Sequence, residues 1–188
     1  MSIRNRAGGM SLIELIIFIV IVAIAVTGVL IVLTTTARSS SDPALRKQML
    51  AIAESLLEEA ELMPFTYCDP DDANVLNATS TAGCTVASNA EGASSPQASE
   101  TRGSLATPFD NVWDYNGFSM TGITDISNIT AIPGLSGYRA AVSVAAAALN
   151  TISLASGDAV LINVTVTAPN GDSIALGGYR TRYAPNSP

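Results

Sequence analysis

The chain has 188 residues, and its 9 Lys and Arg against 16 Asp and Glu give a net charge of −7, a balance that argues against general affinity for nucleic-acid phosphates. It contains no histidine, which excludes the commonest general base, the commonest metal ligand and every Ser-His or Cys-His nucleophile. P-loop, paired CxxC and dinucleotide-binding motifs are missing as well, so we expect neither an enzyme nor an organic cofactor.

The first predicted element is a membrane-spanning helix. Residues 15–33 are apolar except for Thr27 and Gly28, close to the roughly 20 residues that cross a bilayer. Arg4 and Arg6 precede this run, so we expect the N-terminus to stay cytoplasmic and the rest of the chain to lie outside. A secretory signal peptide cut after Ala25 is the competing interpretation, but the apolar run continues beyond that point.

Glu14 lies near the start of this apolar run. A charge at the helix centre costs about 2.5–3.5 kcal/mol, and each Leu, Ile, Val or Phe returns about 0.3–0.6 kcal/mol, so the segment still inserts. A carboxylate in a membrane span is by default a functional group that needs a partner. A plain membrane anchor that merely tolerates Glu14 is the alternative.

Gly9, followed by Met10-Ser11-Leu12-Ile13-Glu14, resembles the cleavage and methylation site of type IV prepilins. Met10 stands where the family usually has Phe. The resemblance implies that a prepilin peptidase cuts after Gly9 and methylates the new N-terminus, and that Glu14 pairs with the terminal amine of an adjacent subunit. It also implies the α+β type IV pilin fold, in which a long N-terminal helix, transmembrane in its first half, packs on an antiparallel β-sheet with a disulfide-closed loop.

Four segments follow from the patterns and the resemblance together. They are the leader peptide 1–9, the transmembrane and filament-core helix 10–37, the amphipathic second half of the helix 38–64, and a globular head 65–188 with a flexible insert at about 87–107. Asp42-Pro43 predicts a helix restart after a break near residues 39–43. Leu45, Met49, Ile52, Leu56, Ala60 and Met63 then form one apolar stripe, which predicts an amphipathic helix that ends near Pro64.

Cys68 and Cys84 are the only cysteines and enclose 15 residues. Because thiols outside the cytoplasm tend to be oxidised, we expect them to form a disulfide. The loop between them also places oxygen ligands at close spacing, which makes it a weak candidate for calcium, although the EF-hand glycine and distal glutamate are out of register and Asp-Pro-Asp-Asp is ordinary turn chemistry. These candidate ligands are Asp69, Asp71, Asp72 and Asn74.

Residues 87–107 are rich in Ala, Ser, Gly and Thr and read as a mobile surface insert. Aromatic residues then gather between Thr107 and Met120. We favour packing under a loop for this cluster, and a ligand loop carried by Trp113 and Tyr115 is the alternative.

The last third of the chain predicts the sheet. Residues 138–144 and 160–167 alternate between apolar and polar side chains, as half-buried strands do. A turn at 169–172 leads to a third strand over 174–183. Its large side chains change parity after Leu176, so we predict a bulge at Gly177-Gly178.

Several segments resemble MshD-like minor pilins of mannose-sensitive haemagglutinin (MSHA) type pili. They are "DPALRKQMLAIAESLLEEAELMPFTYCDPDDAN", "TPFDNVWDYNGFSM", "GLSGYRAAVSVA" and "GGYRTRYAPN". The resemblance implies a minor pilus subunit that first sits in the bacterial inner membrane with its head in the periplasm and later joins an extracellular filament. Its partners would be other pilin subunits, the prepilin peptidase, and the inner-membrane assembly platform with its ATPase. A minor pseudopilin of a type II secretion system, and a membrane-anchored binding head outside any filament, are the alternatives.

Overall fold

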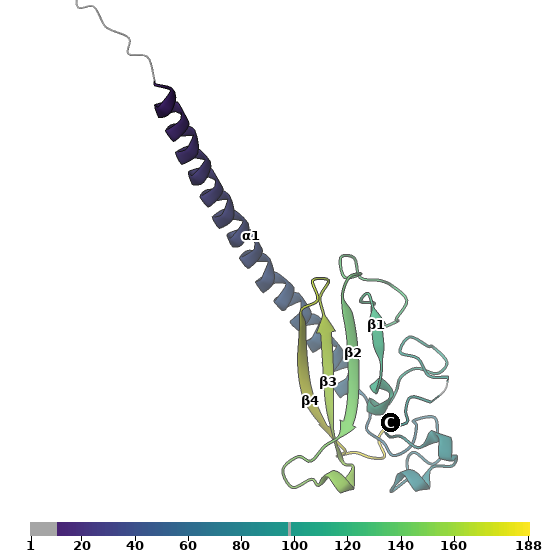
Figure 1. The fold of residues 1–188 in the computed structure, drawn as a ribbon. Helices are drawn as coiled ribbons and strands as arrows, with labels where there is room; N and C mark the ends of the chain where they lie inside the picture. Colours follow the sequence, from purple (N-terminus) through teal and green to yellow (C-terminus); the bar gives the residue numbers. More distant parts are fainter. Residues whose placement is uncertain (1–10, 98) are drawn as a thin grey trace, which may run out of the picture. The chain divides into compact units, whose positions relative to one another are not determined.

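The computed structural model describes residues 11–97 and 99–188. They contain one long helix, α1 (Leu12–Leu62), four short 3-10 helices and four strands (Figure 1). The 3-10 helices are η1 (Thr81–Gly83), η2 (Ala87–Asn89), η3 (Val112–Tyr115) and η4 (Leu154–Ser156). The strands are β1 (Ser119–Thr121), β2 (Arg139–Ala146), β3 (Ala159–Thr167) and β4 (Ser173–Thr181).

The chain divides into two compact units, Met1–Ala44 and Leu45–Pro188, called here the N-terminal and C-terminal units. Helix α1 contributes to both. The predicted break near residues 39–43 is wrong, because α1 continues through this stretch with Pro43 inside it. A proline removes one backbone hydrogen bond from a helix, and a helix with good helix formers on its C-terminal side accommodates that loss.

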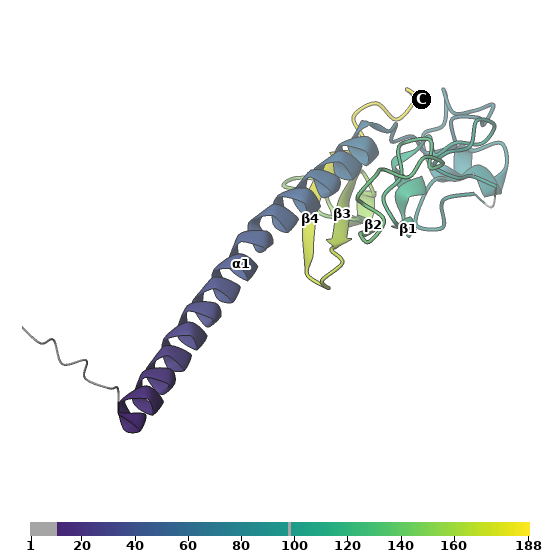
Figure 2. The same cartoon turned by 90° about the horizontal axis from the view of Figure 1, so that it is seen from above.

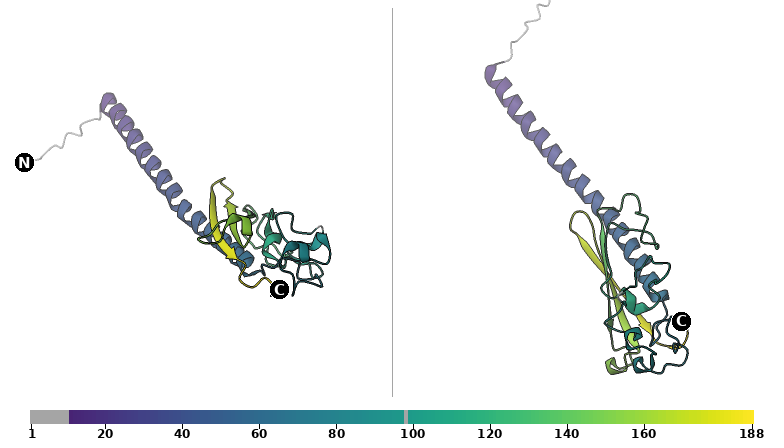
Figure 3. Two further views of the ribbon diagram at one scale, coloured as in Figure 1. Left: turned by 90° about the horizontal axis from the view of Figure 1, so that it is seen from below. Right: turned by 90° about the vertical axis from the view of Figure 1, so that its right-hand side faces the viewer.

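In the C-terminal unit, the end of α1 lies along one face of the sheet (Figure 3, right). The predicted apolar stripe supplies the contact: Met49, Ile52, Leu56 and Ala60 are buried, as are Ala53 and Leu57 beside them. The helix ends at Leu62, two residues before Pro64, as expected. This one-sided packing makes a two-layer α+β unit.

The sheet is antiparallel throughout, with the order β1-β2-β3-β4 (Figure 2). Alternation correctly predicts its two central strands. Val160, Ile162, Val164 and Val166 of β3 are fully buried, and Ala140, Val142 and Val144 of β2 face the same core. The opposite face of these strands is partly open to solvent and carries small and polar residues such as Ser143 and Thr165.

The predicted bulge in β4 is wrong. Its register against β3 runs without interruption from Ser173 to Thr181. Gly178, not Tyr179, occupies the core-facing position, because a Cβ there would overlap the carboxylate of Glu61 and crowd Leu57 on α1. Tyr179 therefore points away from the core and is half exposed.

Residues 64–115 form a loop-rich region beside the β1 edge of the sheet (Figures 1 and 2). The predicted disulfide is present: Cys68 and Cys84 are joined, with their Cα atoms 5.5 Å apart. Val75 and Ala78 form a small second core with Cys68. Near the end of the chain, Asn186 donates to the carbonyl oxygens of Val75 and Ala78 at 3.0 and 2.9 Å and so fastens this loop. A long helix, an antiparallel four-stranded sheet and this disulfide fit the type IV pilin fold.

Candidate functional site

The first candidate site is the start of α1. Residues Leu12–Thr34 form the one helix, within the described part of the chain, that is long and apolar enough to cross a membrane. Its two polar hydroxyls are satisfied inside the helix, since Thr27 and Thr34 donate to the carbonyl oxygens of Ala23 and Ile31 at 2.7 and 2.9 Å. Such back-bonding lets hydroxyl side chains sit in an apolar span.

Glu14 lies in the first turn of α1 with an exposed side chain. No residue in 11–97 or 99–188 donates a hydrogen bond to its carboxylate or forms an ion pair with it. A partner for this carboxylate therefore lies outside the described residues. The predicted processing residues, Gly9 and Met10, lie outside the described residues.

The second candidate site is the disulfide-closed loop, whose four predicted calcium ligands do not act together. Asp72 is the hub of the loop: it accepts bonds from the backbone of Asn74 and Thr85 and from the side chain of Asn89. Burial opposes its ionisation, but these bonds outweigh it and lower the pKa of Asp72 to about 2. Asn74 instead donates to the carbonyl oxygen of Gly83 at 2.6 Å. Both residues thus hold the loop together.

Asp69 and Asp71 face a different group of acids. One carboxylate oxygen from each, and one from Asp110, lie within 4.8 Å of one another. Asp114 of η3 and two acids of the 87–107 segment border these three. We call the six residues the acidic cluster: Asp69, Asp71, Glu91, Glu100, Asp110 and Asp114.

Crowding of negative charge changes how these groups ionise. Burial, with repulsion from Asp69, raises the pKa of Asp110 to about 7, and burial with the adjoining Asp69 carboxyl raises that of Glu100 to about 7. Burial and repulsion from Glu91 raise the pKa of Asp114 to about 9. Burial also raises the pKa of Glu91, although bonds from Ser95 and Gln97 oppose it. Burial and mutual repulsion therefore disfavour ionisation of all these carboxyl groups at once.

The aromatic loop does not present a ligand platform. Trp113 is 6 % exposed and Tyr115 is 2 % exposed, so neither offers a ring face to solvent. Phe109, Tyr115 and Phe118 pack edge to face, with ring centroids 5.2–6.3 Å apart. The loop is part of the core, which is the interpretation that the sequence favoured.

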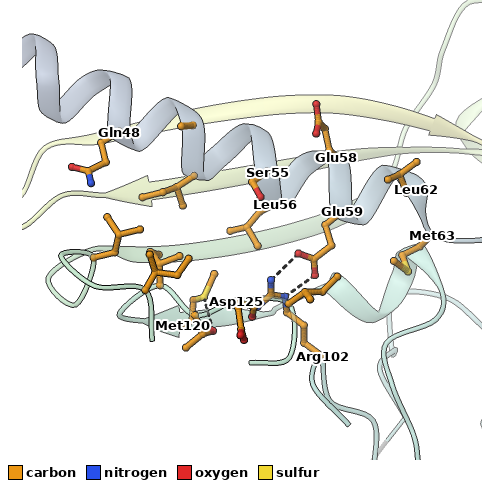
Figure 4. A pocket seen from close by; sticks show the side chains of 17 residues that line it. Gln48, Ser55, Leu56, Glu58, Glu59, Leu62, Met63, Arg102, Met120 and Asp125 are labelled. Atoms are coloured by element: carbon orange, nitrogen blue, oxygen red, sulfur yellow. Dashed lines mark hydrogen bonds and ion pairs between the residues drawn. The ribbon is translucent and has the colours of Figure 1, made fainter. Parts of the chain in front are cut away.

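An open groove of about 530 Å³ runs between the end of α1 and residues 120–135 (Figure 4). Its lining is mainly apolar, and a buried ion pair lies along it. The guanidinium of Arg102 binds both carboxylate oxygens of Glu59 at 2.6 and 2.7 Å, and the hydroxyl of Tyr115 donates to the same carboxylate at 2.6 Å. Arg102 also donates to the carbonyl oxygen of Asp125 at 2.7 Å, so this one side chain ties α1 to two loops.

Sequence reasoning missed most of these polar groups. Asp110 and Asp114 read as turn formers among aromatic residues, and Arg102 lies in a stretch predicted to be a mobile insert. Arg102 and Glu91 of that stretch are in fact 9 % and 3 % exposed. No local pattern marks Arg102, because its partners Glu59 and Asp125 lie 43 and 23 residues away along the chain.

A family model described as the prokaryotic N-terminal methylation motif matches residues 4–30. No curated protein and no solved structure matches the chain. The matched motif includes Gly9, Met10 and Glu14, and together with the apolar helix it fits membrane anchoring before assembly. It supports a type IV pilin-like prepilin or pseudopilin, a structural class that a prepilin peptidase processes and that assembles with other pilins.

Proposed function

We propose that the chain is a minor structural subunit of a type IV pilus of the MSHA kind. The prepilin peptidase cuts between Gly9 and Met10, and the new N-terminal amine is methylated. The mature subunit waits in the inner membrane, anchored by Leu12–Thr34. An assembly platform and its ATPase then move it into the filament, where it supports assembly, adhesion or surface display.

The observation that carries this proposal is the Glu14 carboxylate at the start of α1, next to the position where cleavage would create an amine. Glu14 is a carboxylate without a polar partner in the described chain, at the edge of an apolar span. Cleavage after Gly9 would create a positive charge on Met10, four residues before Glu14 in the sequence. In a low-dielectric filament core, a carboxylate and an amine from neighbouring subunits strongly favour contact with each other.

The minor-subunit role rests on the four sequence segments that resemble MshD-like proteins. The C-terminal unit supports it as well, since its disulfide suits an oxidising compartment outside the cytoplasm. A pseudopilin of a type II secretion system shares the stalk, so the machine has to be identified in cells. Deletion of the gene should reduce pilus number or pilus-dependent adhesion and leave protein secretion unchanged; the reverse outcome would assign the chain to a secretion system.

Mass spectrometry of the native N-terminus tests the processing step directly. We expect a mature chain that begins with N-methylated Met10. An intact Met1 would contradict processing and favour a plain membrane anchor, whereas a start at Val26 would indicate a cleaved signal peptide and a secreted head.

Substitution of Glu14 tests assembly. We expect Glu14→Ala to be inserted and processed normally but to be several-fold depleted from sheared filaments, because the neighbouring amine loses its partner. Glu54→Ala is the matched control, since Glu54 is an exposed acid on α1 outside the membrane span. Wild-type amounts of the Glu14 variant in filaments would refute the pairing.

A further inference from the structure

We propose that the C-terminal unit binds a Ca²⁺ ion at the acidic cluster, with Asp69, Asp71 and Asp110 as direct ligands. The three carboxylate oxygens lie within 4.8 Å of one another. Ca²⁺ binds oxygens at 2.3–2.6 Å, so two ligands of the same ion lie at most about 5 Å apart. The three oxygens are therefore close enough to share one ion.

A buried oxygen that lacks a partner points to the same place. Asp114 is only 1 % exposed, and its Oδ1 atom has no hydrogen-bond partner. Its other oxygen, Oδ2, accepts from the backbone N–H groups of Asp110 and Asn111 at 3.0 and 2.7 Å, which fixes the carboxylate. Repulsion from Glu91 and Glu100 acts on this carboxylate, which therefore borders these two members of the cluster. Asp110 Oδ1 is likewise buried and without a partner.

No ion pair among the described residues joins the cluster to a lysine or arginine. The groups that shift the pKa values of Glu91, Glu100, Asp110 and Asp114 most strongly include no lysine or arginine. The nearest arginine in sequence, Arg102, is engaged by Glu59. Buried carboxylates are normally paired, hydrogen-bonded or bound to a metal, and hydrogen bonds leave the buried Oδ1 atoms of Asp110 and Asp114 without a partner.

The donor set selects the kind of cation. All candidate ligand atoms are carboxylate oxygens, and both cysteines are tied up in the disulfide. Hard oxygen donors on irregular loops suit Ca²⁺, which accepts six to eight ligands in flexible geometry and completes its shell with carbonyl groups and water. Mg²⁺ demands near-octahedral geometry at shorter distances and gives up its water reluctantly.

The position of the site indicates what the ion does. Asp69 and Asp71 follow Cys68 in the disulfide-closed loop, Glu91 and Glu100 belong to the 87–107 segment, and Asp110 and Asp114 flank the start of η3. The three direct ligands therefore link two segments that have little regular secondary structure, and the carboxyl groups of Glu91 and Glu100 border the ion from a third. We infer that Ca²⁺ stabilises this loop-rich region.

The test measures cation-dependent stability of the full-length chain in detergent. Thermal unfolding is compared in EDTA, CaCl₂ and MgCl₂, with NaCl added to equal ionic strength. At a Ca²⁺ concentration 100 times its Kd we expect the Tm to rise by about 5 °C or more, and Mg²⁺ to give less than half of that shift. No shift with Ca²⁺, or an equal shift with Mg²⁺, would overturn the assignment.

Two variants locate the ion. Asp110→Asn and Asp71→Asn should each weaken Ca²⁺ binding by about tenfold or more, because each removes a charged ligand. Asp172→Asn is the matched control in the exposed turn between β3 and β4 and should keep wild-type affinity. Asp71 is exposed, so its variant keeps the comparison valid if the Asp110 variant fails to fold.

Terbium luminescence gives a second readout. Tb³⁺ takes the same oxygen ligands as Ca²⁺, and Trp113, the only tryptophan, is the neighbour of Asp114 in sequence. Excitation of Trp113 should sensitise Tb³⁺ emission that Ca²⁺ displaces. Retention of wild-type Ca²⁺ affinity and Tb³⁺ emission in both variants would place the ion elsewhere and overturn the proposal.

Discussion

The ion pair between Glu59 and Arg102 gives the sharpest test of how the C-terminal unit is held together. The two side chains are 9 % and 4 % exposed, and the guanidinium binds both carboxylate oxygens. Arg102→Met keeps much of the side-chain volume but leaves the Glu59 carboxylate with only the Tyr115 hydroxyl as a donor. The variant thus leaves a charge nearly unpaired in a mostly buried position.

Breaking a buried ion pair by removing one partner costs about 3–5 kcal/mol. Glu59 also lines the open groove, where water can approach it, so we expect the lower end of this range, about 3 kcal/mol. For a chain of this size that loss lowers the Tm by roughly 6–12 °C. Thermal unfolding in detergent, followed by Trp113 fluorescence, measures the shift.

The double variant Glu59→Met with Arg102→Met separates the interaction energy of the ion pair from the other effects of each substitution. Because it removes both charges, we expect it to recover at least half of the stability that Arg102→Met loses. Arg46→Met is the matched control, since Arg46 is exposed on α1, and should change the free energy of unfolding by less than about 0.5 kcal/mol. A loss below about 1 kcal/mol for Arg102→Met, or a double variant as unstable as the sum of the single ones, would refute the reasoning.

Three further predictions concern other parts of the C-terminal unit. Replacing both cysteines by serine should lower the free energy of unfolding by about 3 kcal/mol, the chain-entropy value for a 15-residue loop, as denaturant titration would measure. Gly103→Ala should cost more than about 2 kcal/mol, because its Cβ would overlap the carbonyl oxygen of Ser127; Gly92→Ala, where a Cβ meets nothing, is the control. In EDTA, the Tm should fall as the pH rises from 5 to 8. The folded-state pKa values of Glu100, Asp110 and Asp114 lie above their unfolded values, so the folded protein holds extra protons in this range and loses that advantage as they dissociate. A Tm that rises over this range in EDTA would contradict the assignment of those raised pKa values.

The parts of the fold that the sequence predicts are those governed by local periodicity. The strands β2 and β3 follow from alternation because a strand with one buried face repeats every two residues. The apolar stripe of α1 after Leu45 follows from the helical repeat in the same way. Strand β1 has only three residues, too few for any period to appear.

The errors arise where distant residues decide the local structure. Parity in β4 suggested a bulge because Tyr179 and Tyr183 look like core residues, yet the packing of α1 leaves room only for Gly178. The sequence predicted only part of the acidic cluster. Asp69 and Asp71 are close in sequence, whereas Asp110 comes near them only in the folded chain. Spacing alone also does not show that Asp72 and Asn74 hold the disulfide-closed loop together by hydrogen bonds.

Carboxylates that no basic side chain of the described residues neutralises occur in both units of the chain. Glu14 borders an apolar span, and the acidic cluster lies largely buried among loops; in neither place does the described chain supply a neutralising cation. Keeping a charge in such surroundings costs several kcal/mol unless an opposite charge arrives from outside. The two proposals supply that charge in different ways, the amine of a neighbouring subunit for Glu14 and a divalent ion for the cluster. Because the partners differ, EDTA should affect only the C-terminal unit and substitution of Glu14 only assembly, so each proposal can fail without the other.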